Sequence, residues 1–209
     1  MSRPTIELWY EFASSYSFLS VMRIEPLARE AGVAVVWRPF LLGPVFLALG
    51  WNDSPFNIYP PKGRYMWRDL TRLAEKYRLA FRLPTRFPRD GLLAARVALQ
   101  LAETGPVAAF SRAVMHANFA EDRDIADPAV IADILRAVDL APQPLLAAAV
   151  TPENKQALHR QTACAAEMGL FGAPSFRVGE ELFWGNDRLE DALEWAIHHP
   201  PEDEVRGAQ

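Results

Sequence analysis

The sequence predicts an α/β fold in which an all-α-helical stretch interrupts a small domain of mixed strands and helices. Two observations carry this prediction. The chain opens with a strand, a helix and a second strand within about its first 40 residues, and it closes with two strands and a helix. Between these two parts, the segments with a clear hydrophobic periodicity have a helical period.

The composition is typical of a folded globular protein. The chain has 209 residues, half of them hydrophobic, and a net charge of −4, which is enough chain for a sizeable core. The basic residues are scattered, so we expect no nucleic-acid partner. No apolar run approaches the roughly 20 residues that cross a bilayer. The first residues lead directly into a strand, so we expect no signal peptide and a cytoplasmic protein.

The residues that most often build metal or nucleophile sites are few. Cys164 is the only cysteine, so neither an internal disulfide nor a cysteine-based metal site is expected. It falls in an alanine-rich helical segment, where we expect a buried or inert thiol. The four histidines lack the spacing of metal ligands. The Gly-x-Ser-x-Gly elbow of serine hydrolases is absent from the sequence.

The first strand and helix place a cluster of serines at a helix start. Residues 5–12 are rich in β-branched and aromatic side chains, as in a buried strand. Ser14, Ser15 and Ser17 follow, and helical spacing then continues to Gly32, a typical helix end. A helix N-terminus stabilises an anion, and a thiolate is one such anion. Serine at this place is equally typical of a simple N-cap, so both roles of Ser14 stay open here.

A second strand and a long helical block follow. Residues 33–37 complete a strand–helix–strand unit with parallel strands. Asp127 and Thr151 each precede a proline, which predicts N-caps with proline at the first helical position. We expect loops over 51–63 and 79–89, and no strand in this block. The expected helices are 41–50, 65–77, 91–103, 107–119, one from 128 and one from 152 to about 168.

The C-terminal part returns to strands. Residues 175–178 and 181–184 flank Gly179-Glu180, a two-residue hairpin signal. Asp187 and Glu190 predict a capping box ahead of a final helix, and we expect a frayed tail from His198 onward. This order of elements is the layout of a thioredoxin-like domain. Its expected parts are residues 1–40 and 170–209, with 41–169 as the helical insertion.

Two positions of this layout bear on chemistry. Ser14 and Ser17 occupy the places of the two cysteines in the Cys-x-x-Cys motif of redox members, so we do not expect a dithiol oxidoreductase. Pro174 stands where thioredoxin-like proteins carry a cis-proline before a strand. A cis bond there would turn the backbone of Ala173 toward a substrate sulfur, although an ordinary proline at a strand start is the alternative.

Four stretches of the chain carry a resemblance to a known family: FASSYSFL (12–19), PKGRYMWRD (61–69), FGAP (171–174) and FWGNDR (183–188). Together they resemble the 2-hydroxychromene-2-carboxylate isomerase family, whose close relatives are the kappa-class glutathione transferases. The resemblance covers residues 5–197 and keeps the family's order. It implies glutathione as cofactor, a small-molecule substrate and a homodimer.

The resemblance also implies roles for residues at the two ends of the chain. Ser14 would place its hydroxyl against the glutathione sulfur, where it favours the thiolate. The backbone of Ala173, before Pro174, would pair with the cysteinyl part of glutathione. Asn186 and Asp187 match the pair that holds the γ-glutamyl end. Asp187 could bind that ammonium group, cap a helix, or do both.

Further candidates come from the middle of the chain. Asn52 and Lys62 match the loop that the family uses around glutathione. Asn57 competes with Asn52 for this role, and Lys62 is equally a solvated lysine. Arg38, Arg64 and Lys62 are the cations that we expect near a substrate carboxylate, where they would stabilise enolate charge.

The implied reaction is the cis–trans isomerisation of an intermediate of aromatic catabolism. A glutathione thiolate adds to an unsaturated keto acid, the bond rotates, and elimination returns the thiol. Two departures from the family stand out: Ser15 replaces its proline, and residues 45–49 lack its substrate-side lysine. The second puts the hydroxychromene substrate in question but not glutathione. The alternatives are a kappa-like transferase that conjugates electrophiles and a non-redox thioredoxin-like binding module.

Overall fold

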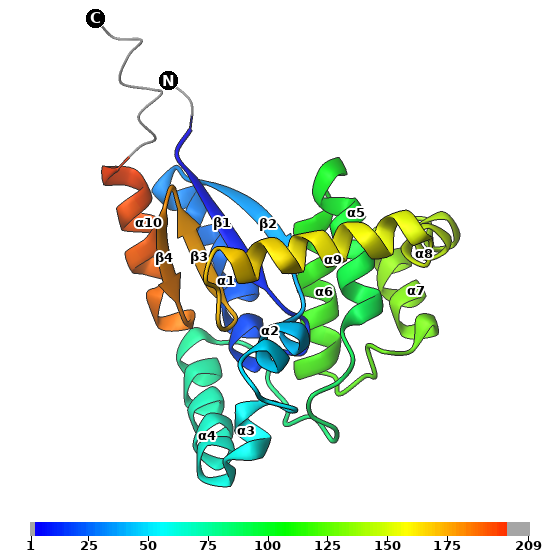
Figure 1. The fold of residues 1–209 in the computed structure, drawn as a ribbon, viewed down its shortest axis with the longest axis horizontal. Helices are drawn as coiled ribbons and strands as arrows, with labels where there is room; N and C mark the ends of the chain where they lie inside the picture. The colour runs from blue at the N-terminus through cyan, green and yellow to red at the C-terminus, as the bar shows by residue number, and fades with distance from the viewer. Residues whose placement is uncertain (1–2, 200–209) are drawn as a thin grey trace, which may run out of the picture.

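A four-stranded sheet in the order β2-β1-β3-β4 lies at the centre of the computed structural model, which describes residues 3–199 (Figure 1). Strand β1 (Thr5–Tyr10) pairs in parallel with β2 (Ala34–Pro39) and antiparallel with β3 (Ser175–Val178). Strand β4 (Glu181–Trp184) closes the hairpin with β3. The thioredoxin-like layout and the bounds of the hairpin are confirmed.

Helices cover both faces of the sheet. Helix α1 (Ser15–Ala31) packs with α10 (Leu189–His198) on one face. The other face carries α2 (Leu42–Ala48) and the C-terminal end of α9 (Pro152–Glu167), which pack over Trp9. Helix α1 ends at Gly32, which has a φ of 70° and donates its N–H to the last carbonyls of the helix, as the sequence predicts.

The block between β2 and β3 is helical, and no strand lies within it. Helices α5 and α6 stand beside the sheet, while α3 and α4 extend below its end (Figure 1). The remaining helices are α3 (Pro55–Ile58), α4 (Pro60–Tyr77), α5 (Leu92–Thr104), α6 (Val107–Phe119), α7 (Pro128–Ala137) and α8 (Pro142–Ala149).

Two predictions about this block were wrong. The expected loop over 51–63 contains α3 and the first turn of α4, and α8 was not expected at all. All three helices begin with a proline, at Pro55, Pro60 and Pro142. Proline at the first helical position loses no hydrogen bond, because the N–H of that position has no intrahelical partner. The clusters of prolines therefore mark helix starts rather than loops.

The predicted capping box at Asp187 was also wrong. Residues Asn186–Arg188 form a 3₁₀ turn, and α10 begins only at Leu189. The Asp187 carboxylate lies 3.6 Å from the Arg188 guanidinium, and Glu190 pairs with Arg23 instead of folding back. The extra turn moves Asp187 away from the helix start. The expected frayed tail from His198 falls largely on residues 200–209, outside the described part of the chain.

Buried polar bonds join the sheet to the helical block. The Tyr10 hydroxyl shares a buried hydrogen bond of 2.7 Å with Ser111 on α6, and burial raises the pKa of that phenol. The Asn118 amide donates to the Phe12 carbonyl at 3.0 Å. The Phe12 ring packs edge-on against Phe110, with centroids 6.3 Å apart. Helix α6 therefore holds the segment that leads from β1 into α1.

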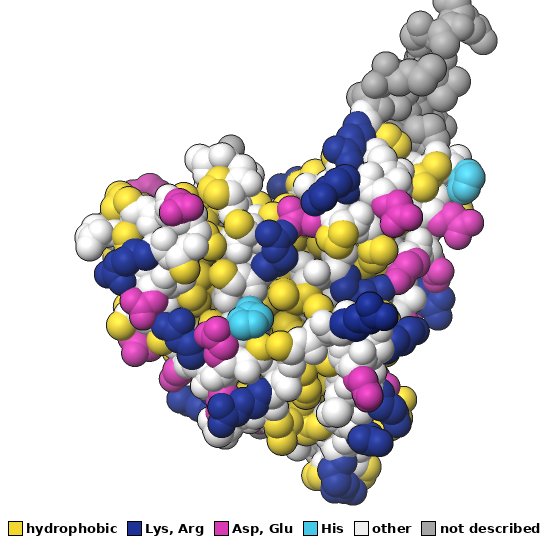
Figure 2. All heavy atoms as spheres, turned by 180° about the vertical axis from the view of Figure 1, so that it is seen from behind, with side chains coloured by type: hydrophobic (Ala, Val, Ile, Leu, Met, Phe, Trp, Pro, Cys, Tyr) yellow, Lys and Arg dark blue, Asp and Glu magenta, His cyan; other side chains and the backbone are white. Residues whose placement is uncertain are grey.

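The surface shows mixed charge. On the face drawn in Figure 2, basic and acidic side chains alternate without a large patch of one sign. Within residues 3–199, no helix combines the length and the hydropathy that a membrane span requires.

Candidate active site

A cavity of about 1620 Å³ opens beside the N-terminus of α1. Four stretches of the chain supply its walls: the end of β1 with the start of α1, the segment from α2 to α4, the connector before α5, and the region around β4. They meet here because β1 and β3 are neighbours in the sheet, which brings the two ends of the chain together. The expected glutathione site falls in this cavity.

Ser14 lies in the wall of the cavity and caps α1. Its Oγ accepts a hydrogen bond from the Ser17 N–H at 3.2 Å and donates one to the Ala173 carbonyl at 2.9 Å. The Ala173–Pro174 peptide bond is cis, which decides between the two alternatives that the sequence left open for Pro174. The capping role of Ser14 is thus observed, and its hydroxyl also faces the cavity wall that Ala173 forms.

The neighbouring serines are turned away from this role. Ser15 Oγ donates to Met66 Sδ at 3.1 Å and is 2% exposed, while Ser17 is fully buried and accepts from the Glu11 N–H at 3.5 Å. Ser14 is therefore the serine of this cluster whose hydroxyl is best placed for a ligand.

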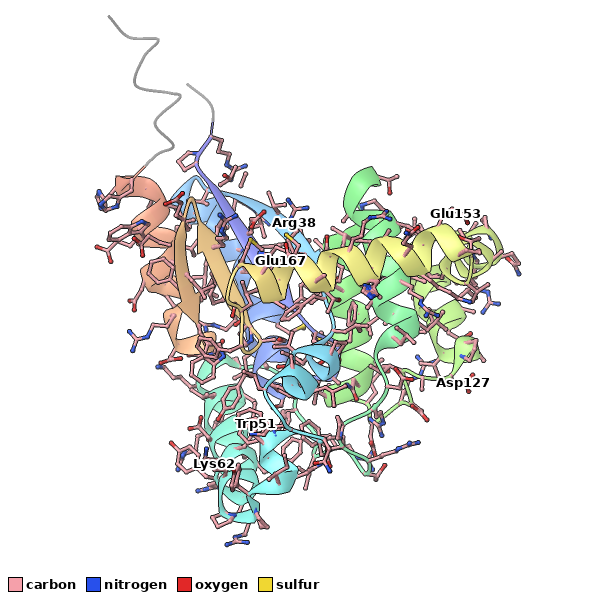
Figure 3. All side chains as sticks on the ribbon, viewed as in Figure 1. Arg38, Trp51, Lys62, Asp127, Glu153 and Glu167 are labelled. Carbon is pink, nitrogen blue, oxygen red and sulfur yellow. The ribbon has the colours of Figure 1, made fainter. Side chains whose placement is uncertain are left out.

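Three further predicted ligand residues line the same cavity with exposed side chains: Asn52, Lys62 and Asp187. Lys62 Nζ lies 5.1 Å from the ring centroid of Tyr59, and Figure 3 shows Trp51 and Lys62 in the same region of the fold. The Asp187 side chain is 75% exposed. The cavity thus presents an amide, an ammonium and a carboxylate to a polar ligand.

Asn186 also lines the cavity but is 3% exposed. Its Oδ1 accepts hydrogen bonds from Ser20 Oγ and from Arg23 Nη1, both at 3.1 Å. The side-chain oxygen is therefore used to tie this turn to α1. Pro174 is buried behind Ala173, and its carbonyl accepts the Gly185 N–H at 3.0 Å.

The structure does not bring Arg38, Asn57 or Arg64 into the wall of this cavity. Arg38, on β2, donates twice to Glu7, at 3.0 and 3.1 Å, and lies well away from Lys62 in Figure 3. Asn57 donates to the Asp53 carboxylate. Arg64 points elsewhere because α4 turns another face to the cavity, with Lys62, Tyr65, Asp69, Leu73 and Lys76 at helical spacing.

Aromatic side chains that sequence reasoning did not assign to the site form much of the apolar wall. Phe171 and Trp184 pack edge-on with centroids 4.8 Å apart, and both are about half exposed at the rim. Gly172 lies under this pair, and a Cβ atom there would collide with the Trp184 indole nitrogen. The sequence held no local signal for this place, because burial does not alternate along β4, where Glu181 and Trp184 are both exposed.

Glu11 was missed as well. It lines the cavity, and its pKa is raised to about 7, because burial disfavours the carboxylate and the charge of Asp90 lies close. Hydrogen bonds from the backbone N–H groups of Leu42 and Ala13 offset part of this rise in pKa. Strand alternation could have found it: Glu7, Trp9 and Glu11 follow one face, opposite Tyr10 and Phe12.

Few of the described residues could bind a metal ion or act as a thiol. Among residues 3–199, no group of three or more His, Cys, Asp or Glu side chains is placed to hold a metal ion. Cys164 is exposed on α9 rather than buried, because Thr162 and Ala165 take the inward positions, and it does not line the cavity.

Comparisons with known proteins agree on the fold. The family model of the DSBA-like thioredoxin domain matches residues 5–195. The 2-hydroxychromene-2-carboxylate isomerase of Sphingobium xenophagum is 29% identical over 187 residues, which are 89% of this chain and 94% of that protein. Human glutathione S-transferase kappa 1 is 28% identical over 207 residues, with 89% and 88% covered.

Solved structures show the same fold. A 2-hydroxychromene-2-carboxylate isomerase structure superposes with a TM-score of 0.80 at 23% identity, covering 98% of this chain and 100% of that one. The cytosolic disulfide reductase DsbM from Pseudomonas aeruginosa, solved with GSH, superposes with a TM-score of 0.63 at 16% identity, covering 97% and 99%. These likenesses establish the architecture.

Proposed function

This chain belongs to the DSBA-like thioredoxin domain family, and from that premise we propose that it is a glutathione-dependent isomerase of the 2-hydroxychromene-2-carboxylate type. One observation carries the proposal. A serine hydroxyl, Ser14, stands at the N-terminus of α1 where redox members have a cysteine, and it faces the carbonyl before the cis-proline. A site of this kind suits a thiol brought by a cofactor rather than by the chain.

The proposed role of Ser14 is to stabilise the glutathione thiolate. A helix N-terminus favours an anion, and a hydroxyl donor adds a direct hydrogen bond. The Ser14 proton that now points to the Ala173 carbonyl would turn to the sulfur. That carbonyl would then accept the cysteinyl N–H of glutathione.

Other cavity residues would hold the ends of the tripeptide. Asp187 is the proposed partner of the γ-glutamyl ammonium group, on a turn that Asn186 fixes to α1. Lys62 and Asn52 also line the cavity and would bind carboxylate and carbonyl groups. Of the three cations that we had expected near the substrate carboxylate, only Lys62 lines the cavity, so Lys62 is also the proposed partner of that group.

The reaction proposed is reversible thiolate addition. The sulfur adds to an unsaturated carbon of the keto acid, the former double bond rotates, and elimination restores both the double bond and the thiol. Phe171, Trp184 and Trp51 would hold the flat, conjugated substrate against the apolar wall. Glutathione is not consumed in this scheme.

A kappa-like transferase is the second candidate, and α2 favours it. That helix presents Phe46 and Leu47 to the cavity and carries no cationic side chain, so this wall suits an apolar electrophile. Incubation with a 2-hydroxychromene-2-carboxylate decides between the two. An isomerase interconverts the isomers at constant glutathione, whereas a transferase depletes glutathione as adduct forms.

The first experiment is a titration of glutathione into the protein, with thiolate absorbance followed in the ultraviolet against pH. We expect the bound thiol to ionise well below its free value in the wild type, and the shift to disappear in Ser14→Ala. Thr151→Ala is the matched control, because Thr151 caps α9 through the same kind of bond, far from the cavity. Each substitution removes an N-cap worth about 1 kcal/mol.

Each outcome of this titration has a clear meaning. A shift lost only in Ser14→Ala supports the proposed site. A shift that persists in Ser14→Ala removes Ser14 from the sulfur. If glutathione does not bind, a non-redox binding module becomes the better interpretation of the chain's function. The resemblance leads us to propose a homodimer, which sedimentation tests. The cytoplasmic location expected from the sequence stays a proposal, which cell fractionation tests.

A further inference from the structure

Glu11 lines the same cavity as Ser14 and precedes it by three residues. It follows the last residue of β1, its carbonyl accepts the Ser14 N–H at 3.0 Å, and its N–H donates to Ser17 Oγ. Strand alternation sends its side chain to the face of the sheet that α2 covers, together with Glu7 and Trp9. One short turn therefore carries both a carboxyl group and the serine at the helix start.

Each element that packs around Glu11 has identifiable charged or polar groups. The connector before α5 brings Asp90, whose charge raises the pKa of Glu11, while Arg89 turns away to Asn118 and Asp122. Helix α2 offers the Leu42 N–H and no ionisable side chain among its residues. The other ionisable groups of the cavity wall are Tyr16, Asp53, Lys62, Tyr65, Asp69, Lys76, Tyr77, Asp187 and Arg188.

A thiolate formed in this place would add a second negative charge beside Glu11 and Asp90. Two anions close together in a partly dry cavity repel each other strongly, so they do not ionise independently. The arrangement is least costly when one group gives up its charge as the other gains it. Glu11 is suited to that exchange, since its pKa of about 7 lies between those of ordinary carboxyl and thiol groups.

We propose that Glu11 accepts the proton of the glutathione thiol when the thiolate forms beside Ser14; this inference rests on the proposed function. The S–H bond breaks, its electron pair stays on sulfur, and the proton binds a carboxylate oxygen of Glu11. The net charge of the cavity does not change. When elimination returns the thiolate at the end of an isomerisation, the proton can pass back from Glu11 to sulfur.

The test counts the protons released per thiolate formed on binding. Calorimetric titrations of glutathione in buffers with different ionisation heats give the protons, and ultraviolet absorbance gives the thiolate. Near pH 8, where Glu11 is almost fully ionised before binding, we expect almost no release from the wild type and nearly one proton from Glu11→Gln. In the wild type, release should rise as the pH falls below about 7, because Glu11 is then already protonated.

A second variant tests the same inference without altering Glu11. Asp90→Asn keeps the bond before the start of α5, where Asp90 Oδ1 accepts the Leu92 N–H at 2.8 Å, and removes the repulsion on Glu11. In Asp90→Asn, proton release should therefore begin at a lower pH than in the wild type. Glu180→Gln, in the exposed turn between β3 and β4, is the matched control and should behave as the wild type.

The outcomes separate this inference from the proposed function. Thiolate formation with equal proton release in wild type and Glu11→Gln overturns the role of Glu11 and leaves the proposed function standing. Absence of bound thiolate in the wild type overturns both. If Glu11→Gln fails to fold, Asp90→Asn decides, because an unchanged pH profile of release contradicts the inference.

Discussion

The side chain of Arg23 joins α1 to the turn that carries Asp187. Its Nη1 donates to Asn186 Oδ1, its Nη2 pairs with Glu190, and its guanidinium lies 3.6 Å from the ring centroid of Tyr77. The arginine is 9% exposed, so these partners replace the water that it loses. The position of the turn that carries the proposed γ-glutamyl site thus depends on Arg23, a residue of α1.

Replacing Arg23 tests this dependence. In Arg23→Met, Asn186 Oδ1 keeps only Ser20, and we expect the free energy of unfolding in urea to fall by about 2 kcal/mol. Glutathione should bind more weakly, while the pKa of the bound thiol stays as in the wild type. Glu190→Gln is the control and should cost about 0.5 kcal/mol, because Glu190 is half exposed. An altered thiol pKa would contradict this role.

The Tyr10–Ser111 bond offers a second test on single residues. In Ser111→Ala the buried phenol loses its partner, and we expect a loss of about 1 to 3 kcal/mol in the free energy of unfolding. Tyr10→Phe in the Ser111→Ala background should recover part of that loss, since the unpaired hydroxyl is gone. The two substitutions are measured as a double-mutant cycle in urea. Simple additivity would show that the bond contributes nothing measurable.

Single residues were predictable from the sequence where a local rule governs them. The cap at Ser14 and the end of α1 at Gly32 follow from residue type and hydrophobic spacing. Arg38 was misplaced because its charge does not reveal its partner, and Glu7 is brought next to it only by strand pairing. Glu11 was missed because a carboxyl group gains its unusual pKa from neighbours that fold around it.

At the scale of elements, the connector between α4 and α5 has its own anchor. The guanidinium of Arg89, 5% exposed, pairs with Asp122 and donates to the Asn118 carbonyl at 3.1 Å. Thr85 donates its N–H to Asp122 at 2.9 Å. These bonds fasten the connector to the end of α6 and thereby set the cavity wall at Asp90.

This anchor predicts how stability responds to acid. Hydrogen bonds from Arg89, and then from Thr85, lower the pKa of Asp122 to about 2. A carboxyl group with a lowered folded-state pKa stabilises the fold fully above its unfolded value near 4, and this contribution is lost as the pH falls through 2. The difference in unfolding free energy between wild type and Asp122→Asn should therefore shrink from pH 4.5 to pH 2. A constant difference would contradict the anchor.

Elements with an uninterrupted hydrophobic period were predicted well, including α7 and α9, which begin with the predicted cap and proline. The short helices α3 and α8, which also begin with proline, were not predicted. Helix α6 and the β3–β4 hairpin have the predicted bounds. Helix α3 is a single turn and α8 is short, so neither contains enough repeats for a periodic signal. Their starts depend on proline, which the sequence shows equally in loops and at helix N-termini.

At the scale of the whole molecule, one apolar core crosses the predicted domain boundary. Phe12 at the end of β1 packs against Phe110 of α6, and the main core continues from the sheet through α1, α5 and α6. The division into residues 1–40 and 170–209 against 41–169 stays a prediction. We expect both parts to unfold in one transition, with tryptophan fluorescence and far-ultraviolet circular dichroism coinciding in urea. Two separated transitions would contradict the expectation of a single unfolding unit.

The general architecture was accessible from the order of elements, but the cavity was not. Its four walls lie far apart in the sequence, and only the packed structure shows that Trp184 and Glu11 share a cavity with Ser14. Pattern reasoning assigns each residue to a face of its own element. It does not tell which faces of different elements meet.

The sheet order β2-β1-β3-β4 also determines when, during synthesis, the cavity wall at Ser14 can form. Strand β1 is made before the helical block, and its partner β3 is made only after that block. Such distant pairing closes a long loop and is slow to form. Ser14 therefore meets Ala173 only after the whole helical block has been synthesised, and the proposed glutathione site does not exist on a nascent chain before then.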